Sequence, residues 1–167
     1  MTHKHCQHAK TVGVSFACLK LKRSSWVEQM REHTAKEIRI YADGASIGNP
    51  GPAGIGIVVE DEKGDVLLTL SKHIGNATAN TAEYMALIEA LKVAKRYSVE
   101  RVVINCDSEL VVKQVNGDYA VRSKELLQLH RRVLKLRERF KECIIRYIPK
   151  SENKRAHNLA QDAIACR

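Results

Sequence analysis

Residues 38–60 read IRIYADGASIGNPGPAGIGIVVE, and this stretch decides the fold. Its first segment, 38–42, alternates apolar and polar side chains, as a strand with one buried face does. The glycine-rich segment, 44–54, contains Asn-Pro-Gly and is interpreted as a turn-forming loop. Strands are expected again at 56–60 and 66–73. Successive strands with short connections predict an antiparallel meander.

The pattern downstream changes to the period of a helix. From 81 to 96 apolar side chains recur three and four residues apart, so we expect one long helix there, capped by Thr78 or Thr81. The β-branched run 101–106 is typical of a central strand covered on both faces. Further helices are expected over 108–116, 123–140 and 152–165, and a last strand over 143–148. The order βββ-α-β-α-α-β-α predicts an α/β protein whose five-stranded mixed sheet has helices packed on its faces.

The composition predicts one soluble globular domain with a short extension. The chain has 167 residues, 44% of them apolar and 28% charged, with only 3 Pro and 9 Gly. That length suits a single compact domain, and that composition excludes low-complexity and fibrous proteins. Charged residues interrupt every apolar run before the roughly 18 to 20 residues that a bilayer span requires. Five cysteines without CxxC spacing indicate neither a disulfide framework nor a four-cysteine zinc site, and favour the reducing cytoplasm.

The first 36 residues differ from the rest. They carry 7 of the Lys and Arg residues and 2 of the Asp and Glu residues, with His3, His5 and His8 near the start. We therefore divide the chain into a basic extension, 1–36, and a globular domain, 37–167. The extension is expected to be a flexible arm that adds non-specific affinity for phosphates. Two alternatives stay open: a zinc site formed by its His and Cys residues, and translation that begins at Met30.

Positive charge is also concentrated near the end of the chain. The formal net charge is +9, and residues 122–155 alone carry twelve Lys and Arg against four Glu. Such a segment fits a surface that binds a polyanion, and it fits equally well a solvated helix face. Charge alone therefore leaves nucleic-acid binding open.

Three acids stand at the ends of expected elements. Asp43 ends the first strand, Glu83 lies in the first turn of the long helix, and Asp107 follows the central strand directly. Side chains at strand ends of such sheets can converge on one ligand site. Carboxylates that converge need cations, and their oxygens suit Mg²⁺ or Mn²⁺. Two such ions about 3.5–4 Å apart would activate water for phosphodiester hydrolysis. Taken one by one, however, each acid could equally be a turn residue or a helix cap.

Four segments that contain these acids resolve the ambiguity. They are DGASIGNPGPAG from Asp43, NTAEYMAL from Asn80, NCDSELVV from Asn105 and ENKRAHNLA from Glu152. Together and in this order they closely resemble the type 1 ribonuclease H family, in its short bacterial and archaeal form, from about Ile38 to Ala165.

The resemblance implies an enzyme that cuts the RNA strand of an RNA/DNA hybrid endonucleolytically and leaves 5′-phosphate and 3′-hydroxyl ends. It makes 37–167 a ribonuclease H-like catalytic domain that acts with two Mg²⁺ or Mn²⁺ ions and is expected to be a monomer. Asp43, Glu83 and Asp107 match the residues that hold the ions. Residues that match contacts to the hybrid are Ser46, Asn49, Thr78 and Asn80. Small and amide side chains near the 2′-hydroxyl suit the recognition of RNA.

The fourth metal ligand departs from the family pattern. Relatives usually have Asp where this chain has His157, and Asp162 lies about 140° further around the helix. An imidazole binds a divalent ion through one nitrogen without negative charge and favours Mn²⁺ over Mg²⁺ relative to a carboxylate. We therefore expect His157 to be a catalytic metal ligand and the enzyme to prefer Mn²⁺. Lys150 is given no catalytic role, because it would need a large pKa depression to act as a base. The alternative function is a non-catalytic or weakly catalytic protein that binds hybrids with the same fold.

Overall fold

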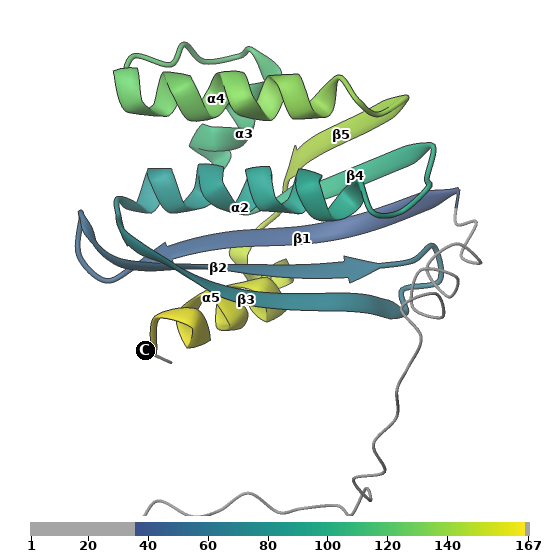
Figure 1. Ribbon diagram of the computed structural model, residues 1–167, viewed down its shortest axis with the longest axis horizontal. Helices are drawn as coiled ribbons and strands as arrows, with labels where there is room; N and C mark the ends of the chain where they lie inside the picture. The colour runs from purple at the N-terminus through teal and green to yellow at the C-terminus, as the bar shows by residue number, and fades with distance from the viewer. Residues whose placement is uncertain (1–35, 166–167) are drawn as a thin grey trace, which may run out of the picture.

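The computed structural model describes residues 36–165. The expectations for the extension, namely the flexible arm, the zinc site and the start at Met30, lie outside the described residues. Within 36–165 the strands form a mixed sheet with the order β3-β2-β1-β4-β5 (Figure 1). The strands are β1 (Glu37–Ser46), β2 (Gly51–Glu60), β3 (Val66–Ala77), β4 (Arg101–Cys106) and β5 (Glu142–Tyr147). The expected meander is confirmed, because β2 pairs antiparallel with both β1 and β3.

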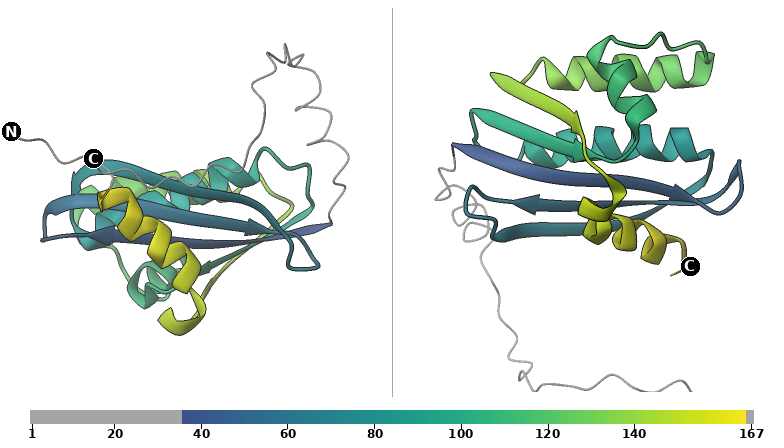
Figure 2. Two further views of the ribbon diagram at one scale, coloured as in Figure 1. Left: turned by 90° about the horizontal axis from the view of Figure 1, so that it is seen from below. Right: turned by 180° about the vertical axis from the view of Figure 1, so that it is seen from behind.

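The helices form a layer on each side of the sheet. They are α2 (Ala79–Ala94), α3 (Glu109–Asn116), α4 (Lys124–Arg137) and α5 (Lys154–Ala165), with a short 3-10 turn, η1 (Lys150–Glu152), before the last. In Figures 1 and 2, α2, α3 and α4 lie on one face and the yellow α5 lies on the other. The predicted α/β class and element order are thus confirmed.

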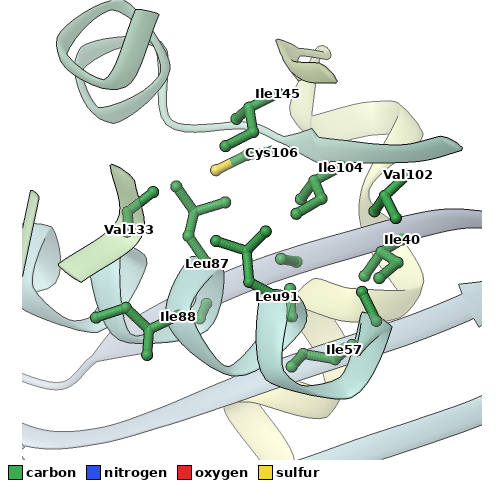
Figure 3. Close-up of a cluster of buried hydrophobic side chains, with 14 of the residues drawn as sticks. Ile40, Ile57, Leu87, Ile88, Leu91, Val102, Ile104, Cys106, Val133 and Ile145 are labelled. Carbon is green, nitrogen blue, oxygen red and sulfur yellow. The ribbon is translucent and has the colours of Figure 1, made fainter. Parts of the chain in front are cut away.

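The main core lies between the sheet and α2. Strand residues such as Ile40, Ile57 and Ile104 meet Leu87 and Leu91 of the helix, and all five are at most 1% exposed (Figure 3). Burying each such side chain contributes about 1.5–3 kcal/mol. Leucines and Val133 of α4 pack on α2 from outside. This core fixes α2 above the strands and therefore fixes the height from which its polar side chains reach the sheet end.

The loop expected at 44–54 is the main correction to the predicted elements. The strand β1 continues to Ser46 and β2 begins at Gly51, so the connection is much shorter. Gly48, with φ 93°, lies in the remaining turn, whereas Gly44, Gly54 and Gly56 of the flanking strands serve close packing. A Cβ on Gly44 would lie 2.2 Å from the Ala82 carbonyl carbon of α2, and one on Gly56 would lie 2.0 Å from the Ala156 oxygen of α5. Both helices therefore approach these strands at backbone distance.

Three helix ends also differ from expectation. Because Thr78 caps α2 with its side chain, the helix begins at Ala79 and Glu83 falls beyond its first turn. The helix expected over 123–140 ends at Arg137 as α4, and the closing helix begins at Lys154 rather than 152. Among residues 36–165 no helix has the length and apolarity needed to cross a membrane.

Candidate active site

Parallel pairing of β1 and β4 brings the first and third acids to one sheet edge. Ala42 lies opposite Cys106 in the register, so Asp43 and Asp107 follow at the same level on neighbouring strands. Asp43 is 3% exposed, and its carboxyl group lies within hydrogen-bonding reach of that of Asp107. The structure thus joins two carboxyl groups that are far apart in the sequence.

The helix α2 adds Glu83 from above. The absence of a side chain at Gly44 lets the backbone of Ala82 and Glu83 approach β1, and the nearby Gly44 N–H opposes the rise in the pKa of the Glu83 carboxyl group. One donor atom each of Glu83, Cys106 and Asp107 lies within 4.8 Å of the others. The Cys106 thiol donates to Glu83 Oε2 at 3.6 Å. Three carboxyl groups and one thiol therefore converge on one small volume.

This convergence disfavours negative charge. Burial, followed by the nearby charge of Asp107, raises the pKa of Asp43 from 3.8 to about 7, although Lys150 opposes the change. Burial and then the charges of Asp43 and Asp107 raise the pKa of Glu83 well above its ordinary value. A divalent cation would offset both effects, because it replaces the water that the carboxylates lose on burial and compensates the repulsion between their charges. The hard oxygen donors present here fit Mg²⁺ or Mn²⁺.

The helix α5 contributes from the opposite layer. The predicted fourth ligand, His157, places Nδ1 at 3.2 Å from Asp43 Oδ2. This position follows from the glycines of β2, because the backbone of α5 around Ala156 and Ala160 rests directly on Gly54 and Gly56. The four residues predicted as metal ligands are thus together: Asp43 and Asp107 follow the last parallel pair of β1 and β4, and one further residue comes from each helix layer.

Sequence reasoning missed Asn153. This residue is 1% exposed, and its Nδ2 donates to the Ala42 carbonyl oxygen at 3.0 Å and to Asp107 Oδ1 at 3.1 Å. Its own carbonyl oxygen accepts the His157 N–H at 3.0 Å, one turn into α5. Asn153 therefore ties β1, the Asp107 carboxylate and the start of α5 together. Its position in the fourth sequence segment was the available signal, but the partners of a buried amide are set by tertiary contacts.

The residues predicted to contact substrate surround the start of α2. Asn49 Oδ1 accepts the Ala79 N–H at 3.2 Å, which holds the β1–β2 connection against the helix. Thr78 caps the helix by accepting the Thr81 N–H at 3.2 Å, and Asn80 next to it is exposed. Ser46 donates to the Gly48 carbonyl oxygen at 3.0 Å. Asn49, Thr78 and Asn80 are thus gathered at one helix end, whereas the Ser46 hydroxyl is used within its own loop.

A family model described as Reverse transcriptase-like matches residues 41–163. Ribonuclease HI of Halobacterium salinarum is 37% identical over 127 residues, which cover 76% of this chain and 64% of that protein. The crystal structure of RNase H1 from the same archaeon has a TM-score of 0.76 and 36% identity, covering 78% of this chain and 99% of that one. This chain belongs to the type 1 ribonuclease H family.

Other ribonucleases H extend the comparison. A bifunctional protein of Mycobacterium tuberculosis is 39% identical over 129 residues, which are 77% of this chain and 35% of that protein. The chain thus spans about a third of the mycobacterial relative and less than two thirds of the halobacterial one. LC11-RNase H1, isolated from compost, has a structure in complex with an RNA/DNA hybrid, with a TM-score of 0.73, 38% identity, and coverage of 77% of this chain and 96% of that one.

Proposed function

We propose that this ribonuclease H-family chain hydrolyses the RNA strand of RNA/DNA hybrids endonucleolytically, leaving 5′-phosphate and 3′-hydroxyl ends. One observation carries the proposal: the carboxyl groups of Asp43, Glu83 and Asp107 converge where the parallel pairing of β1 and β4 ends, and burial and repulsion there raise the pKa values of Asp43 and Glu83. Such a cluster destabilises the isolated fold, so its retention favours a role in binding cations. A protein that only binds hybrids has no need of it.

Asp43, Glu83 and Asp107, with His157, would hold two Mg²⁺ or Mn²⁺ ions. When bound, the ions supply an activated water and compensate the charge that develops on the phosphodiester. The residues of the chain set the geometry around them. Asn153 fixes the Asp107 carboxylate through its 3.1 Å hydrogen bond, and the Cys106 thiol donates to the Glu83 carboxylate. An imidazole in place of a carboxylate at 157 would shift the preference towards Mn²⁺.

The RNA/DNA hybrid would lie across the start of α2 and the β1–β2 connection. Asn49, Thr78 and Asn80 are held there by the Asn49–Ala79 hydrogen bond and the Thr78 cap, beside the carboxylates. Ser46 is proposed as a further contact from the same connection. The positive dipole end of α2 favours a phosphate at this place. Exposed Lys and Arg residues between 122 and 155 would add sequence-independent attraction for the duplex.

The setting of the activity completes the proposal. We place the catalytic domain at 37–167 and the basic extension at 1–36, and we expect a cytoplasmic monomer. The odd number of cysteines, five, and the absence of CxxC pairs support the reducing compartment.

The test is incubation of the full chain with end-labelled RNA/DNA hybrid, duplex DNA, duplex RNA and single strands, with Mg²⁺ or Mn²⁺. We expect cleavage only of the RNA in the hybrid, with 5′-phosphate on the downstream product, and none by Asp107→Asn. Binding of the hybrid in a salt-sensitive manner without cleavage by the unmodified chain would overturn the proposal and support the binding-only alternative.

A further inference from the structure

Cys106 is a sulfur donor inside the carboxylate cluster. Its side chain is fully buried, it forms no disulfide, and its thiol lies among Glu83 and Asp107 with all three donor atoms within 4.8 Å. The other core residues on this face of β4, Val102 and Ile104, are aliphatic (Figure 3). Packing accounts for a small apolar side chain at 106, but it does not require a sulfur that faces a carboxylate.

We propose that Cys106, Glu83 and Asp107 form a binding site for a thiophilic divalent ion, Zn²⁺ or Cd²⁺, and that this ion inhibits hydrolysis. The binding site stands on the donor set alone, whereas the inhibition rests on the proposed function. On binding, the thiol proton passes to solvent and the sulfur coordinates as thiolate.

The donor spacing fits a tetrahedral ion. Bonds of about 2.3 Å to sulfur and about 2.1 Å to a carboxylate oxygen at a tetrahedral angle put the two donors about 3.6 Å apart. The separation between Cys106 Sγ and Glu83 Oε2 is 3.6 Å. The widest separation in the set, up to 4.8 Å, requires a shift of about 1 Å in one carboxylate. Glu83 and Asp107 are both partly exposed, which allows that movement and gives the ion a route in.

The chemistry of the set separates two classes of ion. Mg²⁺ takes oxygen ligands and retains waters in octahedral geometry, so the sulfur adds nothing to its binding. Thiolate ligands select softer ions, and zinc with three protein ligands keeps one open position for water. An ion held by Glu83 and Asp107 in this way occupies two of the carboxylates proposed for catalysis. Zn²⁺ or Cd²⁺ would therefore compete with Mg²⁺ or Mn²⁺.

Cys143 offers a matched control. It is also buried and free, on the neighbouring strand β5, but the side chain close to it is the Arg137 guanidinium, whose charge lowers the pKa of the Cys143 thiol against the effect of burial. A cationic neighbour repels a metal ion. Substitution of Cys143 thus removes a thiol of similar burial without removing a ligand.

The experiment is a titration of the full, reduced chain with Co²⁺, which substitutes for Zn²⁺ and reports a bound thiolate by its charge-transfer absorption. We expect this absorption in the unmodified chain and in Cys143→Ser, and its loss in Cys106→Ser. The cysteines outside the described residues remain in every variant, so their contribution cancels in the comparison. Absence of the band from the unmodified chain, or an equal band in Cys106→Ser, would overturn the proposal.

A second variant tests the site independently, in case Cys106→Ser does not fold. Asp107→Asn leaves the sulfur in place and should weaken Co²⁺ binding about 10- to 100-fold. Unchanged affinity would show that Asp107 shares no ion with Cys106 and would overturn the proposed set. Unfolding curves of each variant, measured by circular dichroism, establish that the fold persists.

Inhibition is measured separately from binding. If the chain cleaves hybrids with Mn²⁺, the Zn²⁺ concentration that halves the rate should rise about tenfold in Cys106→Ser and stay unchanged in Cys143→Ser. Equal inhibition of both variants would remove the inhibitory role. If no hybrid is cleaved under any condition, the proposed function fails while the Co²⁺ titration still decides the binding site.

Discussion

The two ends of the parallel strands both gather carboxylates, and they compensate them in opposite ways. At the N-terminal end, Glu37 lies 3.2 Å from both Arg39 and Arg101, and Arg101 also reaches Glu142 at 3.6 Å. At the C-terminal end, Asp43 is 3% exposed, and its ion-pair partner among the described residues is the His157 imidazole. The carboxylates at the N-terminal end are thus paired with arginines, whereas those at the C-terminal end have no arginine or lysine ion pair among the described residues.

The difference distinguishes acids that serve the fold from acids that serve a ligand. Partly or fully exposed glutamates with arginine partners, such as Glu37 and Glu142, lose only part of their hydration and gain a modest attraction. Buried carboxyl groups that repel each other cost stability unless a charge from outside compensates them. An unmatched, buried cluster is therefore the stronger indication of a cation site, and each of the following experiments tests this contrast.

The largest effect is expected for the rate of hydrolysis. Asp43→Asn keeps the shape of the side chain but removes its charge, and we expect a loss of about 10³-fold or more, since several kcal/mol of charge stabilisation depend on the bound ions. Glu142→Gln at the opposite end should change the rate less than about twofold. Single-turnover cleavage of a hybrid measures both. If Asp43→Asn and Glu142→Gln lost similar amounts of activity, the two ends of the parallel strands would not differ in function as we infer.

The next effect concerns the identity of the metal. His157→Asp adds a carboxylate to the cluster, so the Mg²⁺ concentration for half-maximal activity should fall about tenfold relative to that for Mn²⁺. Asn158→Asp is the matched control, because it adds the same charge at an exposed neighbouring position of α5. Metal titrations of cleavage give the result. Identical profiles for His157→Asp and the unmodified chain would remove His157 from the ligand set.

A smaller effect is expected in the pH dependence of stability without metal. The pKa of Asp43 is about 7 in the fold against 3.8 ordinarily, so between these values the native state binds a proton that the unfolded chain has released. The free energy of unfolding should therefore fall as pH rises through this window and level off above it. Asp43→Asn should flatten this region of the curve and stabilise the protein above pH 7 by at most about 4 kcal/mol, since each of the roughly three pKa units between 3.8 and about 7 corresponds to about 1.4 kcal/mol.

Urea unfolding in the presence of a chelator, across that pH window, measures the difference between the two proteins. Saturating Mn²⁺ should restore the stability of the unmodified chain at high pH and leave Asp43→Asn nearly unchanged. Parallel curves for the two proteins would mean that Asp43 carries no such penalty.

The smallest effect is expected for the paired glutamates. Arg101→Gln leaves Glu37 and Glu142 without their shared cation, yet the Arg101 side chain is 45% exposed, so the loss should be about 0.5–1 kcal/mol and should shrink in high salt. Thermal unfolding at low and high ionic strength tests this. A loss of several kcal/mol that salt does not reduce would show that this end is no ordinary surface network.

The sequence predicted the order and type of the elements because their hydrophobic periods are clear. The spacing of Leu87 and Leu91 on α2, and the consecutive β-branched residues 102–104 of β4, each have one good structural solution. Gly44 and Gly54 were misinterpreted as loop residues, since a glycine serves either a turn, as Gly48 does, or a close backbone approach. The positions of α2 and α5 in the folded protein decide which of these two roles a glycine has, and the local sequence does not contain those positions.

The candidate site was predictable to a similar depth. Asp43, Glu83 and Asp107 stood out by their places at element ends, and His157 by its departure from a motif. Asn153 and Cys106 did not stand out. The sequence pattern already explains an Asn before a helix as a cap and a Cys in an apolar strand as a core residue. What gives each a chemical role is a neighbour far away in sequence, Asp107 for the first and Glu83 for the second.

The contact between β2 and α5 sets the reach of the imidazole from a distance. With the Ala156 oxygen only 2.0 Å from where a Cβ of residue 56 would stand, Gly56→Ala must lift the helix by more than an ångström, as ordinary contacts begin near 3.4 Å. That displacement of α5 would move His157 away from Asp43 and lengthen the hydrogen bond from Asn153 to Asp107. A single added methyl group on β2 would thus move the proposed metal ligands apart. The distance between α5 and β2 is therefore one of the distances that set the geometry of the active site.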